Sequence, residues 1–162
     1  MIKRNDSTEK EFLNIIHENQ RIIYKVCKTY RDTREDQEDL FQEIVYQLWK
    51  SYSSFKGESK ISSWMYRIAL NTAIATYRKR TLPVDYPDKI PEPMHSDTGQ
   101  VSQNEERLFQ ALRTLDDTEK ALVSLFLEGF TYQEIASITG ITENNTGVRL
   151  NRIKNKLKEI LK

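Results

Sequence analysis

The segment 131–158, TYQEIASITGITENNTGVRLNRIKNKLK, carries residue types that suit contact with nucleic acid. A helix beginning after Thr142 would present amides, an arginine and a small-residue gap on one face: Asn144, Gly147, Val148, Asn151, Arg152 and Asn155. Amide and guanidinium groups bond to base edges in the major groove and to phosphate oxygens. Residues 142–162 also hold six Lys or Arg against two acids, a local charge of +4 that suits a polyanion. This face is therefore a candidate surface for reading duplex DNA.

Two short helices must position that face. Thr131 and Glu134 have the T-x-x-E spacing of a capping box, which predicts a helix start, and Gly140 supplies the left-handed residue that ends the helix. Thr142 is then the expected N-cap of a second helix. Its apolar positions recur at steps of three and four: Thr146, Leu150, Ile153, Leu157 and either Ile160 or Leu161. The pattern is that of a helix-turn-helix.

Gly147 lies inside the second of these helices, where glycine costs about 1 kcal/mol relative to alanine. Such a cost is understandable if another group must approach the helix backbone closely at that point. A helix hairpin with a glycine turn also occurs in small helical proteins that bind no DNA. From this segment alone, a purely structural hairpin remains the alternative.

A second stretch, residues 55–80, places aromatic and basic residues side by side. The aromatic members are Phe55, Trp64, Tyr66 and Tyr77, and the basic members are Lys56, Lys60, Arg67, Arg78, Lys79 and Arg80. Aromatic faces interleaved with cations suit unstacked bases and a single-strand backbone. Asn71, about two turns after Trp64, is placed to bond a base edge. The structural alternatives are a core tryptophan at 64 and a solvated helix end at 78–80.

Composition divides the chain into two blocks. The 162 residues, with 30% charged and 38% hydrophobic, fit one ordinary globular domain or two small ones. Residues 81–104 contain all four prolines and carry a net charge of −3, which predicts a flexible acidic linker between residues 1–80 and 105–162. Both blocks show helical rather than strand periodicity. We therefore expect an all-α protein of two small domains, the C-terminal one a four-helix domain with the helix-turn-helix.

Other functional classes find little support in the residues. His17 and His95 are isolated, the single cysteine Cys27 lies on an apolar face, and no phosphate loop, metal-ligand spacing or nucleophile motif occurs. We expect no catalytic residue, no bound metal, no cofactor and no small-molecule substrate. No apolar run approaches the roughly 18 residues that span a bilayer, and the first residues lack the apolar core of a secretory signal. The expected location is the cytoplasm.

The order of these parts resembles the sigma factors of bacterial RNA polymerase. DLFQEIVYQLWKSYSSFKGESKISSWMYRIALNTAIATYRKR is similar to region 2 of the sigma-70 family, and LDDTEKALVSLFLEGFTYQEIASITGITENNTGVRLNRIKNKL to region 4. With only these two regions and a linker, the chain resembles the extracytoplasmic-function (ECF) class. The resemblance covers about residues 10–80 and 105–160, nearly everything except the linker.

The resemblance implies a role for each set of residues. The set matching the grip on the β′ clamp helices of the core polymerase is Asp39, Leu40, Gln42, Glu43 and Gln47. The set matching capture of a base flipped from the −10 promoter element is Phe55, Lys56, Gly57, Glu58, Ser59, Lys60, Trp64, Arg67, Asn71 and Arg78. The set matching the −35 element is Thr142, Asn144, Gly147, Val148, Arg149, Asn151 and Arg152. The chain departs from the family at Gly147 and Val148, where a basic residue and a serine are commoner.

The resemblance also implies partners and a function. The partners are core RNA polymerase, through its β′ clamp helices and β flap, and promoter DNA, with an anti-sigma factor as a further candidate. The linker would thread the RNA exit channel. The implied function is a sigma factor that directs promoter recognition and transcription initiation, without chemistry of its own. The alternative is a stand-alone helix-turn-helix regulator, for which the first domain should offer a ligand pocket instead of a polar helix face and a basic aromatic loop.

Overall fold

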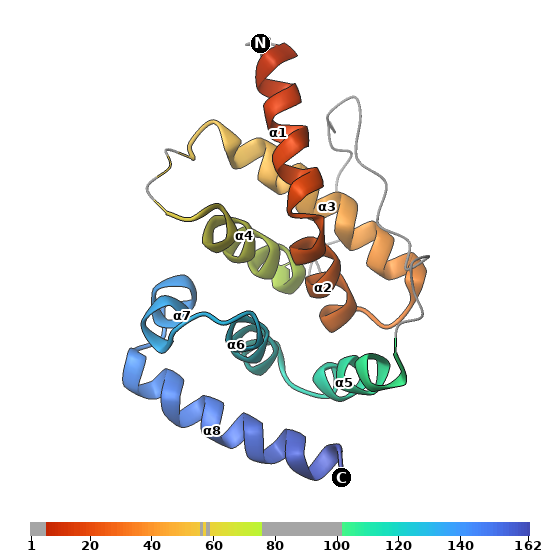
Figure 1. Cartoon of the computed structure of the whole chain (residues 1–162), viewed down its shortest axis with the longest axis vertical. Coiled ribbons are helices and arrows are strands. Elements are labelled where there is room, and N and C mark those ends of the chain that lie inside the picture. The colour runs from red at the N-terminus through yellow and green to blue at the C-terminus, as the bar shows by residue number, and fades with distance from the viewer. Residues whose placement is uncertain (1–5, 56, 58, 76–101) are drawn as a thin grey trace. The chain divides into compact units, whose positions relative to one another are not determined.

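The computed structural model describes residues 6–55, 57, 59–75 and 102–162, and every element of regular secondary structure in them is a helix (Figure 1). The helices are α1 (Asp6–Glu18), α2 (Gln20–Tyr30), α3 (Arg34–Tyr52), α4 (Ile61–Ala75), α5 (Gln103–Arg113), α6 (Asp117–Leu127), α7 (Tyr132–Thr139) and α8 (Glu143–Ile160). Helices α1, α3, α4 and most of α2 belong to one compact unit, and α5 to α8 to a second. The all-α class is thus confirmed. The expected linker lies, up to residue 101, outside the described residues.

The first unit differs from the sequence pattern in where its helices begin and end. The amphipathic face over residues 12–27 is divided between α1 and α2 at Asn19, whose side-chain amide donates to the Ile15 carbonyl at 2.9 Å. Helix α3 has 19 residues and begins inside the polar stretch at 30–37, before the first of its buried residues, Leu40. Thr33 caps it by accepting a hydrogen bond from the Asp36 backbone, and acidic residues in its first turn favour the positive end of the helix dipole.

An aromatic series runs through the first unit from its core to the end of α3. The Phe12 ring, fully buried, lies 4.9 Å from the Trp49 ring and 5.3 Å from the Tyr52 ring. Tyr52 lies 6.2 Å from Trp64 on α4, and Trp64 lies 4.8 Å from Phe55 in the loop between α3 and α4. Helices α3 and α4 pack side by side, and α1 packs on α3 (Figure 1). The loop that follows α3 therefore starts from a rigid apolar support.

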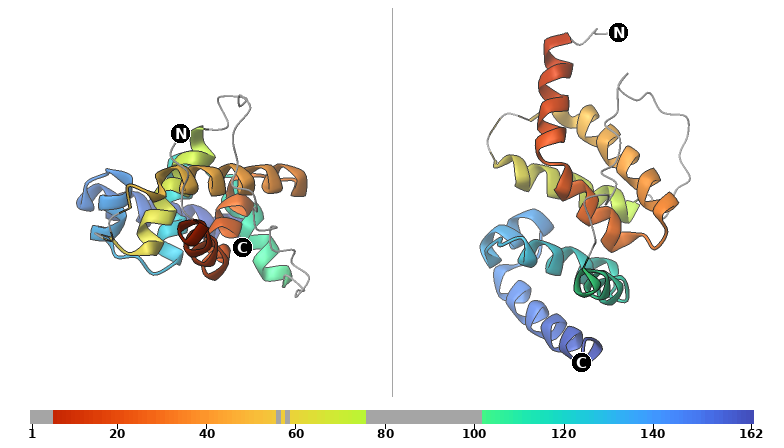
Figure 2. Two further views of the ribbon diagram at one scale, coloured as in Figure 1. Left: turned by 90° about the horizontal axis from the view of Figure 1, so that it is seen from above. Right: turned by 45° about the vertical axis from the view of Figure 1, so that its right-hand side comes forward.

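The second unit is the expected four-helix domain. Each helix has a side-chain N-cap, in order Ser102, Asp116, Thr131 and Thr142. Helix α8 packs against α5, α6 and α7 (Figures 1 and 2). It buries the four positions predicted from its period, namely Thr146, Leu150, Ile153 and Leu157. Of the two candidates for the last apolar position, Ile160 is 44% exposed and Leu161 is half-buried, so the stripe ends at Leu161.

Candidate nucleic-acid interface

Local hydrogen bonds fix the helix-turn-helix formed by α7 and α8. The Thr131 hydroxyl accepts from the Glu134 backbone at 3.1 Å, while the Glu134 carboxylate accepts from the Thr131 backbone at 3.0 Å. Gly140 ends α7 with φ at 80°, in the left-handed region that favours glycine. The Thr142 hydroxyl then accepts from the Asn145 backbone at 3.2 Å and starts α8. The capping box, the glycine turn and the second cap predicted from the sequence are all confirmed.

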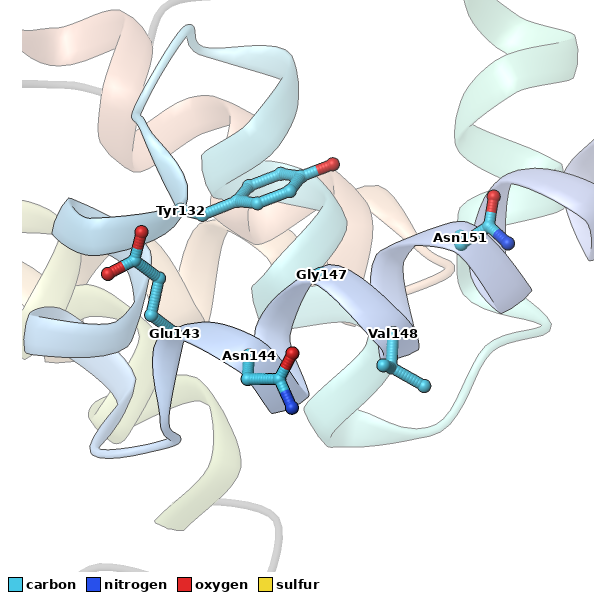
Figure 3. A pocket seen from close by; sticks show the side chains of 6 residues that line it. All are labelled: Tyr132, Glu143, Asn144, Gly147, Val148 and Asn151. Atoms are coloured by element: carbon cyan, nitrogen blue, oxygen red, sulfur yellow. The ribbon is translucent and has the colours of Figure 1, made fainter.

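The N-terminal half of α8 presents the predicted polar face to solvent. A shallow hollow is lined by Tyr132, Glu143, Asn144, Gly147, Val148 and Asn151 (Figure 3). Four of these belong to the set expected at the −35 element. The other members of that set, Thr142, Arg149 and Arg152, are exposed but do not line the hollow. The residues expected from the sequence did not include Tyr132 or Glu143. Tyr132 was missed because it belongs to the preceding helix, α7.

Tyr132 supplies the physical reason for a glycine inside α8. A Cβ at position 147 would lie 3.3 Å from Cε2 and 3.4 Å from Cδ2 of the Tyr132 ring, tighter than most contacts of a Cβ. A group does approach the backbone closely at Gly147, as the sequence suggested, and that group is a side chain of the same unit. Packing between α7 and α8 therefore accounts for a glycine at this position, and the glycine does not by itself indicate a DNA contact.

The basic charge of α8 is partly used inside the second unit. The Lys154 ammonium lies over the Phe126 ring, 4.1 Å from its centroid, and the Lys156 ammonium pairs with Glu119 at 3.0 Å. Lys162 lies 3.4 Å from Glu159. The local charge of +4 therefore overstates the charge that is available to phosphates. Arg149 and Arg152 are exposed and, within the part of the chain that the structure describes, form no ion pair.

A comparison of two glycines tests this interpretation of the turn. Gly140→Ala is expected to destabilise the second unit by about 1–2 kcal/mol, because an L-residue is strained in the left-handed region. Gly147→Ala should cost less, because a gain in helix propensity of about 1 kcal/mol offsets the displacement of the Tyr132 ring. Hydrogen exchange of the α7 and α8 amides in the full chain measures both. Equal destabilisation by the two substitutions would contradict the assigned roles.

The first unit brings together some of the residues expected at the −10 element. Phe55 and Trp64 are half-buried against each other, so Trp64 is neither fully in the core nor fully free. Arg67 and Asn71 are exposed at helical spacing on α4. The remaining described members are exposed, namely Gly57, Ser59 and Lys60. Three further members lie outside the described residues, namely Lys56, Glu58 and Arg78.

Tyr52 anchors the start of this loop. Partial burial, and then the nearby Glu11 carboxylate that accepts its hydrogen bond, raise the pKa of the Tyr52 phenol above its ordinary value. The phenol is therefore neutral at physiological pH and acts as a hydrogen-bond donor. This bond joins α1 to the end of α3, next to the ring pair that supports the loop.

Comparison with known protein families agrees with the order of these parts. A family model of sigma-70 region 2 matches residues 15–82, and a model of sigma-70 region 4 matches residues 105–157. The chain belongs to the sigma-70 family. As a sigma factor it directs promoter recognition in transcription initiation, and its partners are core RNA polymerase and promoter DNA. The stand-alone regulator is not favoured, because the first unit matches region 2.

Individual relatives place the sigma factor in the ECF class. The ECF RNA polymerase sigma factor EcfG of Rhodopseudomonas palustris (strain TIE-1) is 29% identical over 127 residues, which are 76% of this chain and 70% of EcfG. The RNA polymerase sigma factor SigV of Bacillus subtilis (strain 168) is 26% identical over 159 residues, covering 93% of this chain and 91% of SigV. The solved sigma factor RpoE of Bartonella quintana, in complex with the anti-sigma factor NepR, shares the fold. Its TM-score is 0.67 at 20% identity, covering 97% of this chain and 98% of RpoE.

The residues expected to grip the polymerase differ in exposure along α3 of the sigma factor. Asp39 and Gln42 are exposed, and Gln47 is half-buried and donates its amide to the Glu43 carboxylate at 3.2 Å. Glu43 is only 8% exposed, and Leu40, at 3% exposed, is a core residue. Asp39 and Gln42 are therefore the members of this set that a partner can reach most directly, while Leu40 and Glu43 are buried.

Two other properties of the sigma factor bear on its chemistry. No group of three or more His, Cys, Asp or Glu side chains within the described ranges is arranged to hold a metal ion. None of the described helices is long and apolar enough to cross a bilayer.

Proposed function

We propose that this sigma factor grips the β′ clamp helices through the exposed face of α3, captures the −10 element at the loop before α4, and reads the −35 element with α8. The three segments are residues 1–80, 81–104 and 105–162, the middle one acting as a linker. The observation that carries the proposal is the solvent-exposed, amide-rich face of α8, held by a fully capped helix-turn-helix.

Charge and exposure support the role of α8 at duplex DNA. Arg149 and Arg152 are exposed on α8, where a guanidinium can bond a phosphate or a guanine edge. Asn144 and Asn151 are exposed within it, and an amide offers both a donor and an acceptor to a base edge. Helix α7 supports α8 through the Tyr132 ring. A recognition helix that is held rigidly loses little freedom on binding.

The ring pair of Phe55 and Trp64 supports the role of the first unit at single-stranded DNA. An extruded base loses stacking worth a few kcal/mol and needs an aromatic or apolar replacement. The half-buried rings of Phe55 and Trp64 offer such an aromatic surface, and α4 also carries the exposed polar groups of Arg67 and Asn71. The residues expected in this role outside the described ranges, including Lys56 and Arg78, complete the proposed site.

We further propose that the protein catalyses no reaction, needs no cofactor and acts in the cytoplasm, where the polymerase and the chromosome are. Its first partner is core polymerase, through the β′ clamp helices and the β flap. The solved relative RpoE is held by an anti-sigma factor. An anti-sigma factor is accordingly a candidate partner of this chain.

Co-purification with bacterial core RNA polymerase, followed by run-off transcription from a genomic fragment library, tests the function. The expected result is a stable complex that starts transcription at new, sequence-dependent sites. Failure to bind core polymerase, with duplex DNA still bound, would instead indicate a stand-alone regulator.

One substitution tests the proposed polymerase-binding face. Asp39→Ala is expected to weaken core binding by about tenfold, because it removes the exposed carboxylate of the proposed contact. Glu18→Ala is the matched control, since it removes an exposed carboxylate from the end of α1. Fluorescence anisotropy of the labelled sigma factor, titrated with core polymerase, measures both. Equal effects of the two substitutions would argue against a contact through α3.

A further inference from the structure

None of the six residues that line the hollow on α8 is a lysine or an arginine, although the same helix carries exposed arginines. The six lining residues comprise two amides, one carboxylate, one phenol, one valine and one glycine: Asn144, Asn151, Glu143, Tyr132, Val148 and Gly147. Arginine and lysine are the side chains best suited to guanine, whose major-groove edge presents only the acceptors N7 and O6. The chemistry of the lining therefore differs from that of a guanine-reading site.

Tyr132 and Val148 form the two sides of this hollow. Successive residues of a helix are 100° apart, so Asn144 and Asn151 fall between Gly147 and Val148 around α8. The Tyr132 ring covers the Gly147 position, and Val148 lies between Asn144 and Asn151 along α8 and projects away from the ring (Figure 3). Val148 is 46% exposed, so its apolar side chain is accessible to a partner. An apolar group and two amides thus face the same space.

The Tyr132 side is held firmly. The centroid of its ring lies 6.4 Å from that of the Phe126 ring. The Lys154 ammonium lies over the Phe126 ring, 4.1 Å from its centroid. With Gly147 beneath it, the ring occupies the space that a longer side chain at 147 would need. A side chain at position 147 would have to displace this ring, so we expect specificity to come from the neighbouring amides and from Val148.

The four base edges can be compared with this lining. Thymine presents a 5-methyl group, which suits Val148, and adenine presents N6 and N7, which suit an asparagine amide. Guanine presents acceptors only, so the Glu143 carboxylate, itself an acceptor, disfavours it. Cytosine can donate N4 to Glu143, yet it offers no methyl group to Val148.

We propose that this hollow reads A·T base pairs in duplex DNA, with a thymine 5-methyl group against Val148 and an adenine edge bonded by Asn144 or Asn151. Tyr132 acts as a positioning residue that sets the side of the hollow. The proposal rests on the proposed function of α8 at the −35 element. Beyond that function, the proposal specifies that the base pairs of the −35 element that face the hollow are A·T pairs.

Replacement of single thymidines by deoxyuridine tests the proposal, because it removes only the methyl group. The protein is used as holoenzyme with core polymerase, and a duplex selected from a randomised upstream element serves as the probe. At one thymidine, deoxyuridine is expected to lower the affinity of the wild-type holoenzyme about fourfold, which is the equivalent of burying one methyl-sized group. Val148→Ser should make binding insensitive to that replacement. Because Val148 is exposed, this substitution should leave the fold intact.

The outcomes separate this inference from the function on which it rests. A selected element that has only G·C pairs at this position overturns the inference. The inference is also overturned if replacing the thymidine by deoxyuridine leaves the affinity of the wild-type holoenzyme unchanged. It is overturned as well if the replacement lowers the affinity of the Val148→Ser holoenzyme by the same factor. In each of these cases upstream duplex binding persists, and the proposed function stands. A holoenzyme that selects no upstream sequence contradicts the proposed function of α8 itself. Tyr132→Phe keeps the ring and should retain the deoxyuridine effect, whereas Tyr132→Ala should reduce it.

Discussion

Replacement of Phe12 by alanine is expected to lower the free energy of unfolding of the first unit by about 3–5 kcal/mol. The side chain is fully buried, and its ring contacts the rings of Trp49 and Tyr52. Its removal leaves a cavity where α1 packs on α3 and takes away two aromatic contacts. Denaturant unfolding followed by tryptophan fluorescence measures the change, because both tryptophans of the chain, Trp49 and Trp64, belong to the first unit.

Two further substitutions give this experiment its controls. Phe12→Leu keeps much of the apolar volume and should cost clearly less than the alanine change. Asn14→Ala alters an exposed position on the same helix and should change the free energy of unfolding by no more than about 0.5 kcal/mol. If the alanine change at Phe12 were as mild as that at Asn14, α1 would not be a structural part of the unit. The aromatic series would then not support the loop before α4.

Replacement of Arg152 by alanine is expected to weaken binding of the −35 duplex by about 5- to 150-fold, the equivalent of 1–3 kcal/mol. Arg152 is exposed on α8, and among the described residues it forms no ion pair that would hold it away from DNA. Titration of the reconstituted holoenzyme with promoter fragments, with and without the upstream element, measures the loss. Binding to core polymerase should be unchanged.

Lys156→Ala is the matched control for the arginine, because it removes the same charge from the same helix. The Lys156 ammonium is already paired with Glu119 at 3.0 Å, so its loss should alter DNA affinity little. Arg149→Ala should weaken binding at every sequence and lower the slope of the salt dependence by about one charge, as expected of a phosphate contact. Equal losses for Arg152 and Lys156 would mean that α8 binds DNA through general charge alone.

The features predictable from the sequence are those that depend on residues close together in the chain. The capping box of Thr131 and Glu134, the left-handed turn at Gly140 and the cap at Thr142 all involve hydrogen bonds or dihedral angles within a few residues. The buried stripe of α8 follows in the same way from its period. The resemblance to regions 2 and 4, which the family models confirm, rests on the same short-range patterns in a given order.

The features that only the tertiary structure decided depend on contacts between separate helices. Gly147 and Tyr132 belong to different helices, so no spacing rule links them, and the role of the glycine became clear only from the packing of α7 on α8. Likewise, the charge count made from the sequence included Lys154 and Lys156 among the groups available to DNA. In the structure Lys154 lies over the Phe126 ring, and Lys156 forms an ion pair with Glu119.

The same limit applies to the proposed polymerase-binding face. A helical period assigns residues to a face, yet it does not say how wide the buried part of that face is, because this depends on the neighbouring helices. Helices α1 and α4 both pack on α3, and within that packing Leu40 and Glu43 are buried while Asp39 and Gln42 remain exposed. The sequence by itself determined the all-helical class, the caps of α7 and α8, and the family. Packing between helices decided which of their polar side chains are free to bind a partner, because burial is a property of the assembled unit.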